Sequence, residues 1–290
     1  MPELPDIDVY IDALRDRVKG STLKTVRVSK PFLVRSFDPP LSEADGHRVS
    51  DIRRLGKRIV IGLEPDLWLV LHLMVAGRLQ WHDDAVSIRG KHQLAAFDFE
   101  TGTLLLTEAG SKKRASLYLV RGEESLADHD PGGLETLECS LIEFKERLTS
   151  ENRTLKRALT NPRSFSGIGN AYSDEILHTA QLSPVKWTTR LTEDEQQRLF
   201  DAVVSTLTRW RSQLQDEAAG RFPSKVTAFR KDMAVHGKYG KPCPVCGTSV
   251  ARIRYKSNET NYCPTCQTGG KLLADRSLSR LLKDDWPDGV

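Results

Sequence analysis

The chain has 290 residues, 39% of them hydrophobic, and a formal net charge of +4 at pH 7. This length accommodates two or three domains, and no apolar run approaches the ~20 residues of a membrane span, so we expect no membrane partner. The N-terminus lacks a charged segment followed by an apolar one, which excludes a secretory signal and predicts a cytoplasmic, nucleoid-associated protein.

The chain begins with Met1-Pro2-Glu3-Leu4-Pro5. An initiator Met is usually removed when a small residue follows it, which would leave Pro2 with a free secondary α-amine. An α-amine titrates near ~8, well below a lysine at ~10.4, so a useful fraction is unprotonated at neutral pH. Such an amine can attack a sugar carbon and form a Schiff base, and Glu3 could move protons beside it. A frayed chain end without chemistry is the alternative.

Apolar residues at helical spacing predict a helix from Asp6 to Lys19, which Gly20 ends. Short β-like runs follow the helix, separated by turn-forming residues: Leu23–Val28, Arg58–Leu63, Leu67–Leu73, Leu94–Phe99, Thr103–Thr107 and Ser116–Val120. Many short strands at this spacing predict a β-sandwich. With the helix they make an N-terminal domain over residues 1–122.

The acidic stretch over residues 123–138 contains Pro and Gly and is expected to be a linker. Beyond it the apolar residues recur with a helical period, and residues 192–195 form a capping box, so we expect a helical domain over residues 139–224. A loop and a cysteine-rich module follow over residues 225–268. The tail over residues 269–290 carries leucines spaced for a short amphipathic helix, either packed on that module or docking a partner.

Four of the five cysteines form two CxxC pairs, Cys243/Cys246 and Cys263/Cys266, separated by sixteen residues. In a chain without a secretory signal this pattern indicates a metal rather than disulfides. Two such pairs can close a four-thiolate site around one Zn²⁺ at ~2.3 Å from each sulfur. Because no ligand position is left open, we expect a structural ion, with four unrelated thiols as the alternative. Cys139 lies outside the pairs and is expected to be a buried thiol.

A second motif runs from Asn161 to Leu177, where one helix ends and a Gly-rich connector opens a new helix at about Asn170. Backbone N–H groups at the start of a helix form an anion site that suits a DNA phosphate. Asn170 either caps this helix or binds the phosphate. An ordinary connector between two helices is the alternative.

Taken together, Pro2-Glu3-Leu4-Pro5, Gly56-Lys57, Gly167-Ile168-Gly169-Asn170 and the two CxxC pairs resemble the formamidopyrimidine-DNA glycosylase / endonuclease VIII family of base-excision-repair enzymes. The resemblance runs from the N-terminus to about Thr268, with the motifs in the expected order. It implies an α+β multidomain fold with a helix-bearing β-sandwich, a helix–two-turns–helix domain and a four-cysteine zinc ribbon, and with DNA held in a cleft between them.

The same resemblance implies roles for individual residues. Pro2 matches the nucleophile whose amine attacks the sugar C1′, and Glu3 matches the carboxylate that handles the proton of the sugar ring. Lys57 matches a lysine on the phosphate beside the lesion. Asn170 matches an asparagine that grips a phosphate, and Lys156 matches a further phosphate contact.

Several positions depart from the family pattern. Asn258 stands where the ribbon usually offers an arginine to the minor groove. Members of the formamidopyrimidine type fill the gap left by a flipped base with a Met, an Arg and a Phe. Here Met74, or its neighbour Val75, lies near the first of these positions. Lys112-Lys113-Arg114 stands in place of the other two. These departures leave the covalent chemistry intact and put the choice of lesion in doubt.

The sequence therefore predicts a DNA glycosylase with associated AP-lyase activity that binds damaged DNA. We expect a monomer with one structural Zn²⁺ and no small-molecule cofactor. An AP lyase with little glycosylase activity is the nearest alternative. A protein that binds damaged DNA without catalysis is the alternative from a different class.

Overall fold

The computed structural model describes residues 1–224, 226–227, 229–255 and 258–273. The chain forms two compact units, residues 1–131 with 210–227, and residues 132–209 with the described part of 228–290. Most of the amphipathic helix expected in the tail falls on residues 274–290, which lie outside the described residues. Among the described helices, none is long and apolar enough to cross a bilayer.

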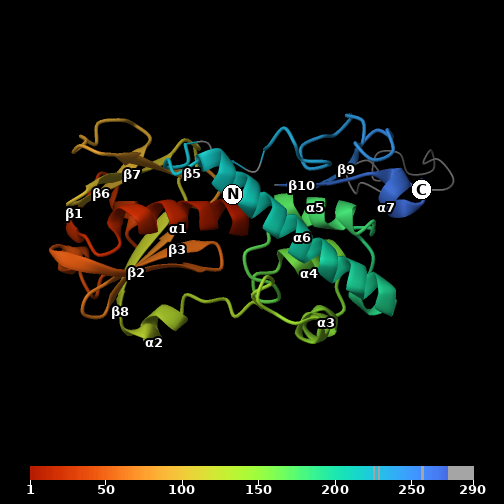
Figure 1. The fold of residues 1–290 in the computed structure, drawn as a ribbon, viewed down its shortest axis with the longest axis horizontal. Helices are drawn as coiled ribbons and strands as arrows, with labels where there is room; N and C mark the ends of the chain where they lie inside the picture. The colour runs from red at the N-terminus through yellow and green to blue at the C-terminus, as the bar shows by residue number, and fades with distance from the viewer. Residues whose placement is uncertain (225, 228, 256–257, 274–290) are drawn as a thin grey trace. The chain divides into compact units, whose positions relative to one another are not determined.

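The first unit begins with helix α1 (Leu4–Val18) and continues with antiparallel strands (Figure 1). The strands are β1 (Thr22–Val28), β2 (His47–Leu55), β3 (Arg58–Leu63), β4 (Leu67–His72), β5 (Gly77–His82), β6 (Gln93–Phe99), β7 (Gly102–Glu108) and β8 (Ser116–Arg121). Two short 3₁₀ helices, η1 (Pro31–Leu33) and η2 (Leu41–Ala44), lie between β1 and β2.

The strands pair in the order β5-β7-β6-β1-β2-β3-β4-β8. Strands β1 and β2 share only two residue pairs, Thr22↔Arg48 and Leu23↔His47. The sheet therefore divides at this junction into two four-stranded halves, which pack face to face as a sandwich around one apolar core. The expected β-sandwich is confirmed.

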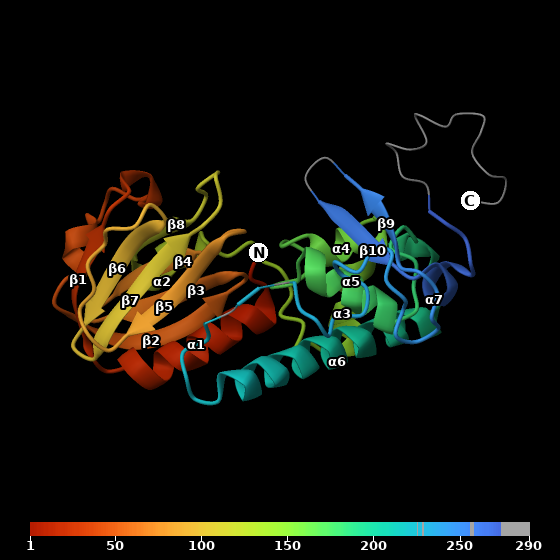
Figure 2. The ribbon, with the colours of Figure 1, turned by 90° about the horizontal axis from the view of Figure 1, so that it is seen from above.

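Helix α1 packs on β2 and β3 of the sandwich (Figure 2). Its apolar stripe, including Ile7, Tyr10 and Leu14, is fully buried in the sandwich core. The helix starts two residues earlier than the expected Asp6, because Leu4 and Pro5 already have helical geometry. The chain start is thereby tied directly to the core of the unit.

Two strands and one α-helix of this unit were not predicted from the sequence, and neither were its two 3₁₀ helices. Strand β2 buries only Val49 and Ile52 along its nine residues, and its charged side chains hide the pattern of a strand. Strand β5 is short, and a short alternation is a weak signal. The expected linker contains the short helix α2 (Gly122–Ala127), which packs on β4 and β8.

The second unit holds α3 (Leu141–Thr149), α4 (Leu155–Thr160), α5 (Asn170–Thr179), the 3₁₀ helix η3 (Thr188–Arg190) and α6 (Glu193–Ala218), whose residues from Trp210 onward belong to the first unit. The capping box predicted at Thr192 is present: the Glu195 N–H donates to the Thr192 hydroxyl at 3.3 Å, and the Thr192 N–H donates to the Glu195 carboxylate at 2.9 Å. Cys139 is half-buried, so the expectation of a buried thiol was wrong.

The cysteine-rich module consists of the hairpin β9 (Ala251–Arg254) and β10 (Glu259–Tyr262), followed by helix α7 (Pro264–Thr268). Strand β10 and helix α7 both pack on α5. The buried core of the module contains Val235 and Val250 together with Cys243 and Cys263. A core this small implies that the cysteines themselves, and what they bind, hold the module together.

Candidate active site

The start of the chain is fixed by a capping box on α1. Glu3 is the N-cap residue, and its carboxylate and that of Asp6 bond reciprocally to each other's backbone, with the Glu3 N–H donating to Asp6 Oδ2 at 3.0 Å. Glu3 and Asp6 are buried residues, 2% and 0% exposed. A carboxylate in the first turn is also favoured by the positive end of the helix dipole. Glu3 is therefore held rigidly beside Pro2.

Pro2 is buried in the chain with Met1 in place. Burial lowers the pKa of the Met1 amine, and nearby charges modify this effect: Glu3 and Asp6 raise the pKa, whereas Arg78 and Lys57 lower it. An amine at the chain start is thus subject to the charges of Glu3 and Lys57.

Lys57 lies in the two-residue turn between β2 and β3, which is closed by the pair Leu55↔Arg58. Gly56, the first residue of that turn, has φ of 60°, a left-handed conformation that glycine adopts without strain. The turn thus requires a glycine at position 56, and it places Lys57 at the tip of the β2–β3 hairpin.

His72, at the end of β4, was missed by the sequence reasoning. It lies opposite Arg58 across the β3–β4 ladder, and its Nδ1 accepts the Met74 N–H at 2.9 Å. Burial, followed by the charges of Arg58 and Lys57, lowers the His72 pKa to about 4. The ring is therefore neutral at pH 7 with its proton on Nε2, which can donate a hydrogen bond. A single histidine on a strand carries no sequence pattern that would have revealed it.

The expected wedge residues lie on two turns of the same unit. Met74 has φ of 52° in the β4–β5 turn and is half-buried, whereas Val75 beside it is 58% exposed. Lys113 donates to the Glu108 carbonyl oxygen, whereas Lys112 and Arg114 are exposed. Their contacts with DNA stay predictions.

In the second unit, helix α4 ends at Thr160 and α5 begins at Asn170, as expected from the Gly-rich connector. The N-cap of α5 is Gly169, so the idea that Asn170 caps the helix was wrong. The Asn170 side chain instead donates from Nδ2 to the Glu259 carbonyl oxygen at 3.0 Å. Asn170 thus joins the start of α5 to strand β10, and its other predicted role, phosphate binding, stays a prediction.

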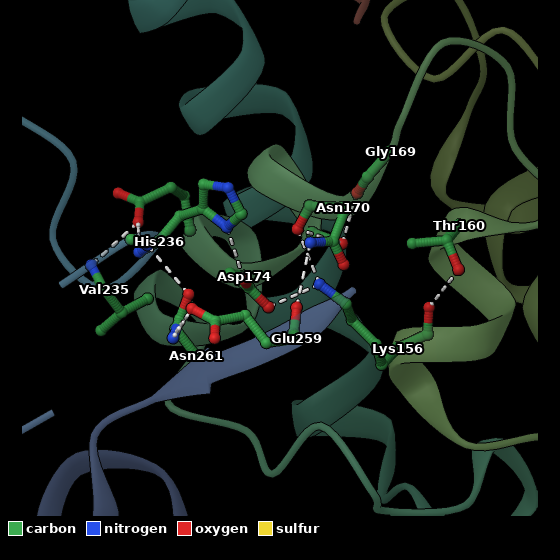
Figure 3. A network of polar contacts seen from close by, with 12 residues as sticks. Lys156, Thr160, Gly169, Asn170, Asp174, Val235, His236, Glu259 and Asn261 are labelled. Carbon is green, nitrogen blue, oxygen red and sulfur yellow. Dashed lines mark hydrogen bonds and ion pairs between the residues drawn. The ribbon is translucent and has the colours of Figure 1, made fainter. Parts of the chain in front are cut away.

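Lys156 points toward the same position from α4 (Figure 3). Its ammonium group donates to the Asn170 carbonyl oxygen at 2.7 Å and to Asp174 Oδ1 at 2.5 Å. The residue is 9% exposed. The structure therefore brings Lys156 and Asn170 together, and the predicted phosphate contact of Lys156 stays a prediction.

Asn258 lies in the turn between β9 and β10, where its carbonyl oxygen accepts the Tyr255 N–H at 2.8 Å. It is exposed, and its neighbours at 256–257 lie outside the described residues. Arg252, one of the basic residues near it in the sequence, is paired with Glu259 at 3.2 Å and lies over the Tyr239 ring at 4.0 Å.

The four paired cysteines converge. Their sulfur atoms all lie within 4.8 Å of one another. The Cys243 and Cys266 sulfurs are 3.9 Å apart, and the Cys246 and Cys263 sulfurs are 3.4 Å apart. A tetrahedral zinc at ~2.3 Å from each sulfur needs S–S separations of about 3.8 Å, so this cluster fits the ion.

The helical module also reaches the cysteine cluster. His178, in the last turn of α5, places Nε2 3.2 Å from the Cys243 sulfur, and both residues are buried. Metal ligands are usually supported by such outer hydrogen bonds. His178 was not identified from the sequence, because the contact joins positions that are far apart in the chain.

The sequence matches three family models. These are the formamidopyrimidine-DNA glycosylase N-terminal domain over residues 1–111, the formamidopyrimidine-DNA glycosylase H2TH domain over residues 133–212, and a zinc finger found in FPG and IleRS over residues 240–269. The zinc-finger match and the four clustered cysteines confirm the expectation of one structural zinc.

Curated relatives match over nearly their whole length. The formamidopyrimidine-DNA glycosylase of Bacillus cereus is 30% identical, with 92% of this chain and 99% of the relative covered. That of Thermus thermophilus is 31% identical, with 93% and 100% covered. Among solved structures, the Lactococcus lactis Fpg in complex with DNA containing an abasic site is 25% identical, with a TM-score of 0.81 over 92% of this chain and 99% of that one.

Proposed function

Because the chain belongs to the formamidopyrimidine-DNA glycosylase family, we propose that it excises damaged bases from DNA and then nicks the strand as an AP lyase in base-excision repair. The single observation that carries this proposal is the start of α1. There the buried Glu3 carboxylate is held in a capping box directly beside Pro2, and the positive charge of Lys57 helps to lower the pKa of the terminal amine.

The chemistry follows from an amine at this position. After removal of Met1, the lone pair of the Pro2 nitrogen attacks C1′ of the deoxyribose, and the base leaves with the electrons of the glycosidic bond. As the nitrogen attacks, Glu3 takes the proton of the resulting ammonium and passes it to the ring oxygen while the sugar opens, which produces an iminium ion between Pro2 and C1′. The iminium acidifies C2′, so loss of a C2′ proton expels the 3′-phosphate and breaks the strand. The target nucleotide must leave the base stack, since C1′ within a duplex cannot meet Pro2.

Phosphate contacts supply most of the affinity in this proposal, so DNA binding is insensitive to sequence and strongly dependent on salt. Lys57 and the neutral His72 ring serve the phosphates near the lesion, and Asn170 grips a further phosphate with support from Lys156. Asn258 approaches the backbone from the ribbon in place of an arginine.

The gap left by the flipped base is filled from two turns of the first unit. Met74 enters from the β4–β5 turn, and Lys112, Lys113 and Arg114 belong to the segment that follows β7. The protein acts as a monomer in the cytoplasm, at the nucleoid.

Covalent trapping tests the assignment of Pro2. The protein is incubated with duplex DNA that carries one abasic site, borohydride is added, and the adduct is quantified. We expect a wild-type adduct, near-complete loss of it in Pro2→Gly, and DNA affinity in the variant within about twofold of the wild type. Intact-mass spectrometry of the same protein should show that Met1 is absent.

Equal trapping by the wild type and Pro2→Gly would exclude this nucleophile. Tight binding without any wild-type adduct would instead indicate a damage-binding protein. A panel of duplexes, each with one defined base lesion or an abasic site, separates a glycosylase from a lyase that acts only on sites already lacking a base.

A further inference from the structure

One face of helix α5 is directed at the zinc-ribbon module. Asn170, Asp174 and His178 are spaced four residues apart and so lie on the same side of the helix. Asn170 bonds to the Glu259 carbonyl of β10, Asp174 to His236, and His178 to the zinc ligand Cys243. The side chain proposed to grip a phosphate is therefore the first of three contacts between this helix and the module.

Asp174 connects the helical and ribbon parts of this face (Figure 3). Its side chain is fully buried, with Oδ1 2.5 Å from the Lys156 ammonium and Oδ2 2.8 Å from His236 Nδ1. A buried carboxylate is stable only when it is paired and hydrogen-bonded, and breaking one side of such a pair is costly. Asp174 thus fixes the positions of both partners.

Lys156 and His236, the two partners of Asp174, in turn hold the surroundings of Asn170 in place. Lys156 donates a second hydrogen bond to the Asn170 carbonyl oxygen at 2.7 Å, which anchors the first residue of α5. His236 lies in a segment whose backbone is already held by Glu175, because the N–H groups of residues 234–236 donate to that carboxylate at 2.8 to 3.0 Å.

An asparagine side chain has two amide hydrogens. In Asn170 one of them is committed to the Glu259 carbonyl, which sets the direction of the other. The orientation of the amide therefore depends on the relative placement of α5 and β10, and the Lys156–Asp174–His236 chain maintains that placement.

We propose that Asp174 and Lys156 are positioning residues for Asn170, and that Lys156 acts on DNA through Asn170 rather than by giving its own charge to a phosphate. This inference rests on the proposed DNA-binding function and on the role of Asn170 within it. The Lys156 charge is compensated by Asp174, and its ammonium group already has two protein acceptors. Its side chain is only 11% exposed.

The salt dependence of DNA binding separates the two roles of Lys156. A lysine that neutralises one phosphate contributes about 0.9 to the slope of log K against log salt concentration. Under the proposal, Lys156→Met weakens binding to abasic-site DNA about tenfold and leaves that slope unchanged. A slope that falls by about 0.9 would overturn the positioning role.

For Asp174→Asn, the two explanations predict opposite changes in DNA affinity. The variant loses a negative charge, so general electrostatics predicts tighter DNA binding, whereas loss of positioning predicts weaker binding. We expect binding about tenfold weaker, and a double variant with Asn170→Ala that is no weaker than Asn170→Ala alone. Tighter binding, or additive losses in the double variant, would overturn the inference.

Lys186→Met is the matched control, because Lys186 forms a comparable 2.5 Å ion pair with Glu195 in the same unit but contacts neither Asn170 nor Asp174 in the part of the chain described. It should leave affinity and slope unchanged. Zinc content and thermal unfolding show whether each variant is folded. If Asp174→Asn loses zinc, the salt dependence of Lys156→Met alone decides between the two roles of Lys156. An Asn170→Ala variant with wild-type affinity would refute the DNA-binding role of Asn170 itself, which differs from a failure of positioning.

Discussion

His72 offers a quantitative test of the active-site geometry. Its ring is neutral in the folded protein because it is buried, because Arg58 and Lys57 lie nearby, and because Nδ1 accepts the Met74 N–H. Protonation of Nδ1 would break that hydrogen bond and place a third positive charge among two others. Replacement by glutamine removes the titrating group from this position.

The magnitude follows from the shift in pKa. An unperturbed histidine titrates near ~6.5, and His72 in the folded protein at about 4. Between these values the unfolded chain binds a proton that the folded chain does not, so stability rises with pH across this window and is lost on acidification. Between about pH 7 and about pH 4.5 this single group lowers the free energy of unfolding by about 2 kcal/mol.

Urea unfolding of the wild type and His72→Gln, measured in steps from about pH 7 to about pH 4.5, tests this value. The unfolding free energy of the wild type minus that of His72→Gln should fall by about 2 kcal/mol as the pH falls. Only the folded wild type contains a histidine at this position that resists protonation. A titration of the His72 ring followed by NMR should give a midpoint near 4. Parallel stability curves, or a midpoint above 6, would refute the neutral donor assigned to this position.

Three further changes give distinct outcomes. Glu3→Gln should slow base release by at least about 100-fold, because it removes a general acid. Strand nicking at a preformed abasic site should fall much less. Equal losses in the two assays would contradict the role of Glu3 in sugar-ring opening. Cys246→Ser should lower zinc content to well below one ion per chain and weaken DNA binding by at least about tenfold, since structural zinc supplies about 10 kcal/mol or more of folding energy. Normal DNA binding without metal would contradict the structural role of the zinc. Arg54→Met should destabilise the first unit by about 2 kcal/mol in thermal unfolding, because it removes the 3.0 Å partner of the mostly buried Asp8, whose contact with Arg211 is longer, at 3.8 Å. An unchanged melting temperature would show that the pair contributes nothing.

Much of the fold could be predicted from local patterns. The strand at Arg58 and the capping box at Thr192 depend on residues a few positions apart, so the sequence displays them directly. The two CxxC pairs predict a metal site for the same reason. Strand β2 was not predicted, because it is defined by its pairing with β3 and its own polar side chains do not show a strand pattern.

The parts of the site that could not be predicted depend on contacts between distant segments. Asp174 and His236 are 62 positions apart, and His178 and Cys243 are 65 apart. Each residue alone looks like an ordinary polar position on a helix or in a loop. Lys156 matched a phosphate contact in the family resemblance, yet the carboxylate that binds it becomes apparent only when α4 and α5 are packed.

The two units divide the work of the proposed reaction in a way that can be separated kinetically. The reacting amine, Glu3 and His72 belong to the sandwich unit, whose core fixes them through α1 and the β3–β4 ladder. Asn170, its supporting network and the zinc site belong to the other unit. If Asn170 binds a phosphate as proposed, a change near it should remove binding that is equally strong in the ground and transition states, and so should raise KM and leave kcat unchanged. A change at Glu3 removes a proton transfer made only in the transition state, and so lowers kcat.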